Sequence, residues 1–105
     1  MSLNIKSNYK DDSDSWIVEL AGELDVSCAN DLKDELESNI EEKFSDVKVD
    51  MSNLQYIDST GIGVIVGAMK KLRSGKKDIT IVEAKENVKK IFKITGLDQI
   101  IRMEG

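Results

Sequence analysis

The sequence predicts a single α/β domain, residues 1–105, in which α-helices cover a mixed β-sheet. The chain opens with two strand-like segments. After them, segments with apolar residues at every second position, typical of strands, alternate with segments whose apolar residues recur every third or fourth position, typical of helices. A chain of 105 residues that is 40% hydrophobic and 33% charged can bury one core of ordinary composition. Since strands that alternate with helices pair in parallel, we expect the order β-β-α-β-α-β-α.

The first half of the chain predicts a strand pair followed by a helix. Leu3–Tyr9 and Trp16–Leu20 alternate as strands do, and the polar residues 10–14 between them indicate a turn. The two strands should therefore form an antiparallel hairpin. A helix is expected after Gly22–Asp25, with Ser27 as its N-cap. The apolar face of this helix is expected to comprise Ala29, Leu32, Leu36, Ile40 and Phe44.

The second half continues the alternation. A strand is predicted at Val47–Met51, a helix that stops near Ser74–Gly75, and a strand at Ile79–Val82. A third helix is expected to end at Gly96, because a glycine followed by an apolar residue is typical of a Schellman stop. The sequence also allows a short final strand at Ile100–Ile101. The third helix carries Val88, Ile91 and Phe92, and Trp16 and Met69 are expected to belong to the core.

The segment Asp58-Ser59-Thr60-Gly61-Ile62-Gly63-Val64 has the most unusual chemistry in the chain, and it lies where a strand ends and a helix begins. One interpretation makes Ser59 or Thr60 the N-cap of the helix. This does not explain the glycines, since a glycine in the first turns costs about 1 kcal/mol relative to alanine. Glycine does let another molecule approach closely, at a helix end that favours negative charge. The second interpretation is that Ser59 is exposed and carries a phosphate.

Two loops are expected to meet at one edge of the sheet. Residues 22–25 and 58–63 both follow strands, and in open sheets of this kind partners bind at the carboxyl ends of the strands. If those two strands are neighbours, Asp25 and Ser59 lie on the same exposed rim. For Asp25 itself, a contact with a partner and a local role at the start of the helix both remain open.

The residues around Ser59 have alternative roles. Asp58 either caps a turn through its carboxylate or shapes the electrostatics around Ser59. Thr60 is expected to cap or support the segment, with phosphorylation on this hydroxyl as the alternative. Gly61 and Gly63 are expected to permit close approach of a partner. Tyr56, just upstream, is compatible with both a packed and an exposed position.

The composition excludes several kinds of function. The chain has no histidine, so a Ser-His-Asp triad, a Cys-His pair and a histidine-containing zinc site are impossible. It also lacks a G-x-x-x-x-G-K-[ST] loop, and we expect no enzyme activity, cofactor or metal.

The net charge and the apolar content limit which kinds of partner and which cellular location are expected. The net charge of −5 argues against direct nucleic-acid binding, and the absence of an eighteen-residue apolar run argues against a membrane span. The single cysteine, Cys28, agrees with a reducing, cytoplasmic location. A basic cluster is explained by the end of the second helix, whose dipole favours cations: Lys70, Lys71, Arg73, Lys76 and Lys77.

Three segments give the chain a resemblance to a known family. Leu20–Asp25 follows an early strand, Tyr56–Gly63 contains the serine motif, and Val88–Phe92 precedes Thr95–Leu97. In this order and at these spacings they resemble the anti-sigma-factor antagonists, small bacterial proteins of the STAS domain class. The resemblance covers nearly the whole chain and implies a single STAS domain over residues 1–105.

The resemblance implies a switch in partner binding. An ATP-dependent anti-sigma-factor kinase would phosphorylate Ser59, and a metal-dependent serine phosphatase of the PP2C class would remove the phosphate. Unphosphorylated antagonist would bind the anti-sigma factor and release the sigma factor to activate transcription. Asp58 would be the acidic neighbour of the site, and Asp25, Thr60, Gly61 and Gly63 would belong to the partner surface. The alternative is a STAS scaffold or small-ligand-binding module in a stress-sensing assembly.

Overall fold

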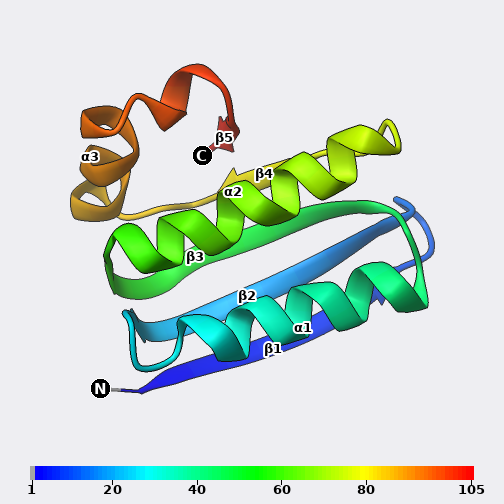
Figure 1. Ribbon diagram of the computed structural model, residues 1–105, viewed down its shortest axis with the longest axis horizontal. Coiled ribbons are helices and arrows are strands. Elements are labelled where there is room, and N and C mark those ends of the chain that lie inside the picture. Colours follow the sequence, from blue (N-terminus) through cyan, green and yellow to red (C-terminus); the bar gives the residue numbers. More distant parts are fainter. Residues whose placement is uncertain (1) are drawn as a thin grey trace.

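The computed structural model describes residues 2–105, and its strands form one sheet whose spatial order, β1-β2-β3-β4-β5, follows the chain (Figure 1). Helices connect the strands from β2 onward, in the predicted order with a final strand added. The elements are β1 (Leu3–Lys10), β2 (Ser15–Leu24), α1 (Ala29–Glu42), β3 (Asp46–Ile57), α2 (Ser59–Ser74), β4 (Ile79–Val82), α3 (Glu86–Ile94), a 3-10 turn (Leu97–Gln99) and β5 (Arg102–Glu104).

Strand pairing confirms a mixed sheet. β1 and β2 pair antiparallel as a hairpin, and the pairs β2–β3, β3–β4 and β4–β5 are parallel. Beside the hairpin turn, Tyr9 pairs with Trp16, and their rings meet edge to face with centroids 5.3 Å apart. Because β2 and β3 are parallel neighbours, the loops that follow them leave the same edge of the sheet.

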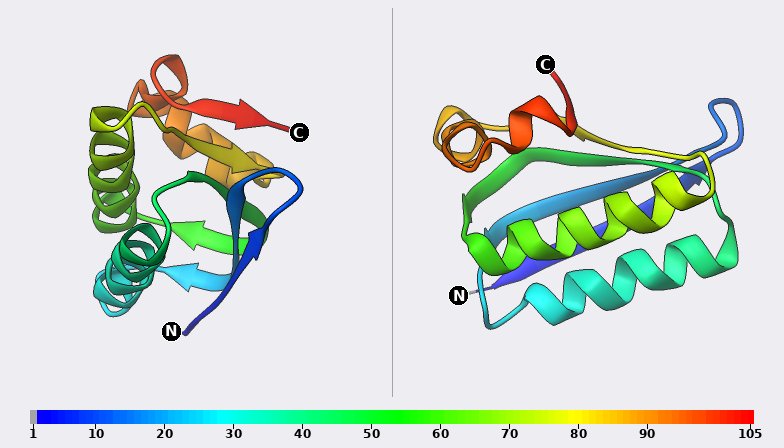
Figure 2. Two further views of the ribbon diagram at one scale, coloured as in Figure 1. Left: turned by 90° about the vertical axis from the view of Figure 1, so that its right-hand side faces the viewer. Right: turned by 45° about the horizontal axis from the view of Figure 1, so that its top comes forward.

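One face of the sheet carries the main core. α1 and α2 lie side by side over this face, and α3 lies apart from them, in contact with β3 (Figure 2). Val18, Val49 and Ile81 stand in register across β2, β3 and β4, and all three are fully buried. Trp16 and Met69 are buried as predicted. The helices contribute the buried side chains Leu32, Leu36, Ile65, Val88 and Phe92.

The structure corrects several predicted boundaries. β3 continues six residues beyond Met51, to Ile57, and the paired β2 accommodates this extension with irregularities on either side of Gly22, whose φ is 109°. The short final strand forms, but at Arg102–Glu104 rather than Ile100–Ile101. Gly96 follows α3 with a φ of 78°, the left-handed conformation that its predicted role as a stop requires.

Phe44 was wrongly predicted to belong to the first helix. α1 ends at Glu42, and Phe44 lies in the following loop with 40% of its surface exposed. Its ring packs directly over Gly75, where a side chain would collide with it. Phe44 therefore joins the loop before β3 to the end of α2 instead of extending the apolar face of α1.

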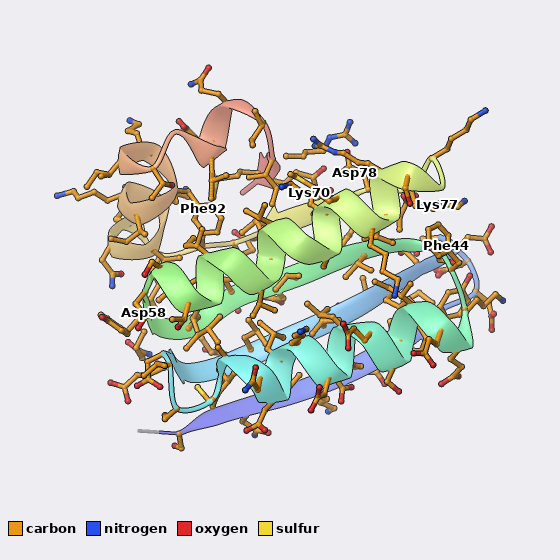
Figure 3. All side chains as sticks on the ribbon, viewed as in Figure 1. Phe44, Asp58, Lys70, Lys77, Asp78 and Phe92 are labelled. Atoms are coloured by element: carbon orange, nitrogen blue, oxygen red, sulfur yellow. The ribbon has the colours of Figure 1, made fainter. Side chains whose placement is uncertain are left out.

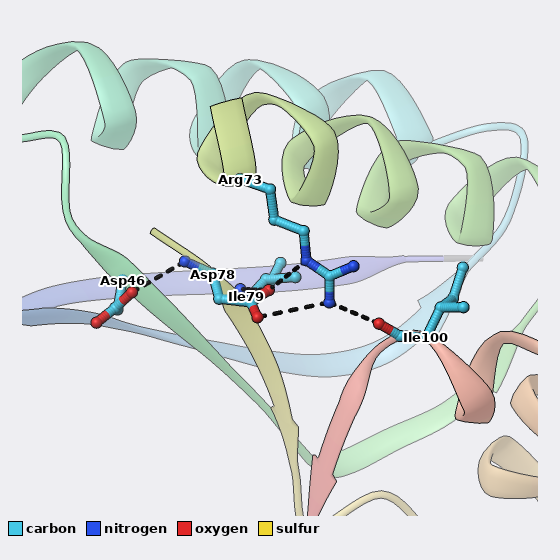
Figure 4. Close-up of polar contacts among 5 residues, drawn as sticks. All are labelled: Asp46, Arg73, Asp78, Ile79 and Ile100. Atoms are coloured by element: carbon cyan, nitrogen blue, oxygen red, sulfur yellow. Dashed lines mark hydrogen bonds and ion pairs between the residues drawn. The ribbon is translucent and has the colours of Figure 1, made fainter. Parts of the chain in front are cut away.

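Arg73, in the last turn of α2, forms hydrogen bonds to the segments that precede β4 and β5 (Figure 4). Its Nε donates to Asp78 Oδ1 at 3.1 Å, and its Nη2 donates to the carbonyl of Ile100 at 2.5 Å. Asp78 Oδ1 also accepts the N–H of Ile79 at 2.7 Å, and the N–H of Asp78 donates to Asp46 at 2.9 Å. Within the basic cluster, Arg73 is thus a structural contact and not only a solvated cation.

Candidate functional site

The loop between β2 and α1 is organised by Asp25. Its Oδ1 accepts hydrogen bonds from the N–H of Ser27 at 3.0 Å and from the Ser27 hydroxyl at 2.5 Å. The hydrogen bond from the Ser27 side chain is the main cause that lowers the pKa of Asp25 below its ordinary value. Ser27 is therefore not the N-cap of α1, as predicted from the sequence. That position belongs to Cys28, which is buried and makes no side-chain cap.

The loop between β3 and α2 repeats this arrangement around Asp58. Its Oδ1 accepts the N–H of Thr60 at 3.0 Å, the N–H of Gly61 at 3.3 Å and the Thr60 hydroxyl at 2.5 Å. Asp58 is thus the N-cap of α2, and the interpretation of Ser59 or Thr60 as the cap is wrong. The bond from the Thr60 side chain is the main cause that lowers the pKa of Asp58, so this carboxylate is charged at neutral pH.

The two loops meet at one rim of the sheet. Leu24 pairs with Ile57 at the ends of β2 and β3, and the N–H of Asp58 donates to the carbonyl of Leu24 at 3.2 Å. The Thr60 hydroxyl lowers the pKa of Asp58, and the nearby charge of Asp25 opposes this with a smaller effect that raises it. Figure 3 shows Asp58 at the start of α2, where this rim lies.

Ser59 is the exposed first residue of α2. Within residues 2–105, no hydrogen bond engages its hydroxyl, whereas the Thr60 hydroxyl is held by Asp58. The side chain of Ser59 is therefore free to react with an external reagent. Its immediate surroundings provide negative charge from Asp58 and, one loop away, from Asp25.

The two glycines of the motif have different environments. Gly61 is buried, and a Cβ there would lie 2.6 Å from Leu24 Cγ and 3.1 Å from Ile57 Cγ1. The close approach at Gly61 is thus to side chains of its own chain, and its role in partner binding stays a prediction. Gly63 is exposed, and no heavy atom would lie within 4 Å of a Cβ there. It remains a candidate for the partner surface.

Two apolar side chains near this rim are exposed. Tyr56, which the sequence left open, is 47% exposed, and Val26, in the loop beside Asp25, is 75% exposed. Val26 could not be recognised from the sequence, because a lone apolar residue in a polar loop has no periodicity that marks it. An exposed side chain with apolar surface therefore lies near each aspartate: Val26 in the loop beside Asp25, and Tyr56 on β3, two residues before Asp58.

The rest of the described chain gives no sign of a metal centre or a membrane span. Among residues 2–105, no group of three or more histidine, cysteine, aspartate or glutamate side chains is placed to hold a metal ion. None of the helices in that range combines the length and the apolar composition needed to cross a bilayer.

Replacing the cap should make the stability of the protein less dependent on acid pH. We expect Asp58→Ala to lose about 0.5–2 kcal/mol at pH 7, the usual effect of removing an N-cap. A carboxylate whose pKa is lowered on folding stabilises above its unfolded pKa and loses that contribution as the pH falls through the folded value. The gap between parent and variant in thermal melts should therefore be full at pH 7 and shrink below about pH 4. A gap that stays constant down to pH 2 would contradict a charged cap.

Comparisons with known proteins agree with this geometry. The STAS domain family model matches residues 6–105. The anti-sigma-B factor antagonist of Staphylococcus epidermidis is 36% identical over 103 residues, which cover 98% of this chain and 94% of that protein. An anti-sigma factor antagonist from Mycobacterium paratuberculosis has a similar crystal structure, with a TM-score of 0.86 at 20% identity over 98% of this chain and 86% of the other.

A third structure is that of the Bacillus cell fate determinant SpoIIAA in the phosphorylated form. It matches with a TM-score of 0.74 at 18% identity, over 95% of this chain and 90% of the other. At this identity the likeness concerns the fold. The family match over almost the whole chain and the identity with the staphylococcal antagonist lead to one conclusion: the chain belongs to the STAS domain family, among its anti-sigma-factor antagonists.

Proposed function

We propose that the chain is a regulatory binding protein of the cytoplasm whose partner choice is set by phosphorylation of Ser59. In the unphosphorylated state it binds an anti-sigma factor and releases the sigma factor to activate transcription. The observation that carries this proposal is the free, exposed hydroxyl of Ser59, which lies beside Asp58 on the same rim as Asp25. The kinase is the anti-sigma factor itself, and a PP2C-class serine phosphatase reverses the modification.

The arrangement favours Ser59 over Thr60 as the acceptor. The hydroxyl that a kinase phosphorylates must be able to turn toward the bound nucleotide. The Thr60 hydroxyl donates to Asp58 at 2.5 Å, and Thr60 would have to break that bond to turn toward a nucleotide. Ser59 has no such bond within residues 2–105 and sits one residue closer to the end of the helix.

The phosphate would change the charge of the rim without unfolding the chain. It adds about 1.5 to 2 negative charges and three acceptor oxygens. A helix N-terminus can neutralise an anion through its free N–H groups, but Asp58 already occupies those of Thr60 and Gly61. The added charge thus remains largely uncompensated, next to two carboxylates. A partner that docks on this rim must desolvate it, at a cost of several kcal/mol, and each 1.4 kcal/mol is a tenfold loss of affinity.

The test is a kinase reaction with defined components. The purified chain, ATP, Mg²⁺ and the anti-sigma-factor kinase of the same genome are incubated, and the phosphorylated peptide is mapped by mass spectrometry. We expect one phosphate on Ser59, an unchanged yield in Thr60→Ala and no product in Ser59→Ala. Labelling of Ser59→Ala but not of Thr60→Ala would move the acceptor to Thr60.

The chain should have no activity toward ATP by itself. No histidine is available as a base, and no phosphate-binding loop is present in the sequence. Incubated alone with radiolabelled ATP, the chain should neither label itself nor release inorganic phosphate above the buffer blank. Stoichiometric self-labelling of a preparation free of other proteins would contradict the proposed division of roles and revive an enzyme function.

A further inference from the structure

A groove of about 420 Å³ runs between α1 and α2 on the outer side of the helical layer. It starts at Thr60, one residue from Ser59, and ends at Lys71 on the last turns of α2. The eleven residue steps from Thr60 to Lys71 correspond to about 16 Å of helix, or roughly three turns. The groove is lined from α1 by Lys33, Leu36, Glu37 and Ile40, and from α2 by Thr60, Gly63, Val64, Gly67, Ala68 and Lys71.

The floor of the groove allows a second backbone to come close. Gly63 and Gly67 lie four residues apart, so they share one face of α2. Both are exposed, and a Cβ added at either position would have no heavy atom within 4 Å. Val64 and Ala68, the residues that follow them, add apolar lining. Unlike Gly61, these glycines are not explained by packing within the chain.

The walls of the groove carry two cations. Lys33 is the only basic residue of α1, Ala29–Glu42, and it lies on the groove side of an otherwise acidic helix. Lys71 stands on the opposite wall, and neither lysine belongs to an ion pair within residues 2–105. Glu37 is the single acid among the lining residues. Two unpaired ammonium groups beside an apolar floor suit an occupant that is apolar on one side and carries carboxylates at its flanks.

We infer that this groove binds an amphipathic, acidic helix of the protein that docks at Ser59. The inference rests on the proposed function, and it extends the contact surface along α2, well beyond the phosphorylated residue. A helix fits because the groove has the length of three helical turns and a floor of open glycines. Its carboxylates would pair with Lys33 and Lys71, and its apolar face would cover Val64 and Ala68.

The test compares neighbouring lysines of α2. Lys71→Glu reverses a charge in the groove, whereas Lys70→Glu makes the same change at an exposed residue that does not line it. Figure 3 shows Lys70 on the side of α2 away from α1. Gly67→Gln fills the open floor with a good helix former. Affinity for the anti-sigma-factor kinase of the same genome is measured by titration calorimetry, and thermal melts verify that each variant is folded.

Lys71→Glu and Gly67→Gln should each weaken binding at least tenfold, while Lys70→Glu stays within about twofold of the parent. If the parent binds and is phosphorylated on Ser59 but all three variants bind equally well, the groove inference fails and the proposed function stands. If the parent neither binds nor is phosphorylated, both fail. Sedimentation equilibrium of the parent alone is run in parallel. Dimerisation that Lys71→Glu abolishes would show that a second copy occupies the groove, which overturns the inference.

Discussion

Ser59→Ala should bind the anti-sigma factor as tightly as the parent and keep binding it in the presence of ATP, whereas Ser59→Asp should bind at least tenfold more weakly. Alanine leaves a small neutral side chain, and the hydroxyl that it removes makes no hydrogen bond within residues 2–105. Aspartate supplies one charge beside Asp58 where a phosphate supplies nearly two, so its effect should be incomplete. The measurement is titration calorimetry with the anti-sigma factor, with and without ATP.

Stability measurements separate a change of charge from a loss of folding. The cap of α2 belongs to Asp58, so both Ser59 variants should unfold within about 0.5 kcal/mol of the parent, as surface substitutions usually do. Thr60→Ala removes the adjacent hydroxyl together with its hydrogen bond to Asp58 and leaves Ser59 in place, so it shows whether the response to ATP depends on Ser59 itself. Tight binding by Ser59→Asp would overturn the electrostatic switch. So would a loss of binding that is accompanied by unfolding.

The two glycines of the motif should respond to alanine with opposite signs. Gly61→Ala places a methyl group 2.6 Å from Leu24 Cγ, and overpacking of a buried site costs about 1–3 kcal/mol. Gly63→Ala has open space around the new methyl group and improves the helix propensity by up to about 1 kcal/mol. Urea denaturation of both variants and the parent measures the difference, which should lie between about 1 and 4 kcal/mol.

This pair carries its own control, because the same substitution is made two residues apart in one helix. The slopes of the denaturation curves should agree, which would show that both substitutions change stability and not the surface exposed on unfolding. If Gly61→Ala were as stable as the parent, Leu24 would be able to move aside for the methyl group, and the predicted overpacking at Gly61 would be wrong. A loss of stability in Gly63→Ala would contradict the open surroundings at that position.

The alternation of the chain was sufficient to predict the fold, because periodic apolar residues report which face of each element is buried. The strand Ile79–Val82 and the end of α2 at Ser74 follow the predicted bounds. The extension of β3 was missed because polar residues after Met51 break the alternation, and its pairing depends on irregularities in β2 that only tertiary contacts reveal. The same holds for Phe44, whose partner, Gly75, lies on another element.

Within the site, the sequence located the segment but not the task of each residue. Aspartate, serine and threonine all cap helices well, so the run Asp58-Ser59-Thr60 offers three candidates that composition cannot rank. Asp58 is the N-cap because β3 ends at Ile57, the residue just before it. Ser59, the next residue, therefore has no capping role. Gly61 and Gly63 are likewise equivalent in the sequence, and only the side chains of Leu24 and Ile57 distinguish them.

The sheet order β1-β2-β3-β4-β5 has a consequence for how the protein is made. Each new strand pairs with the one synthesised just before it, so no strand has to be inserted between two that are already joined. Each pairing therefore closes only the segment that connects two consecutive strands, which limits the entropic cost of loop closure. On a ribosome that adds about 5–20 residues per second, the two loops around Ser59 can meet once β3 has paired with β2. The segments that form the rim around Asp25 and Ser59 are thus all made before β4, α3 and β5.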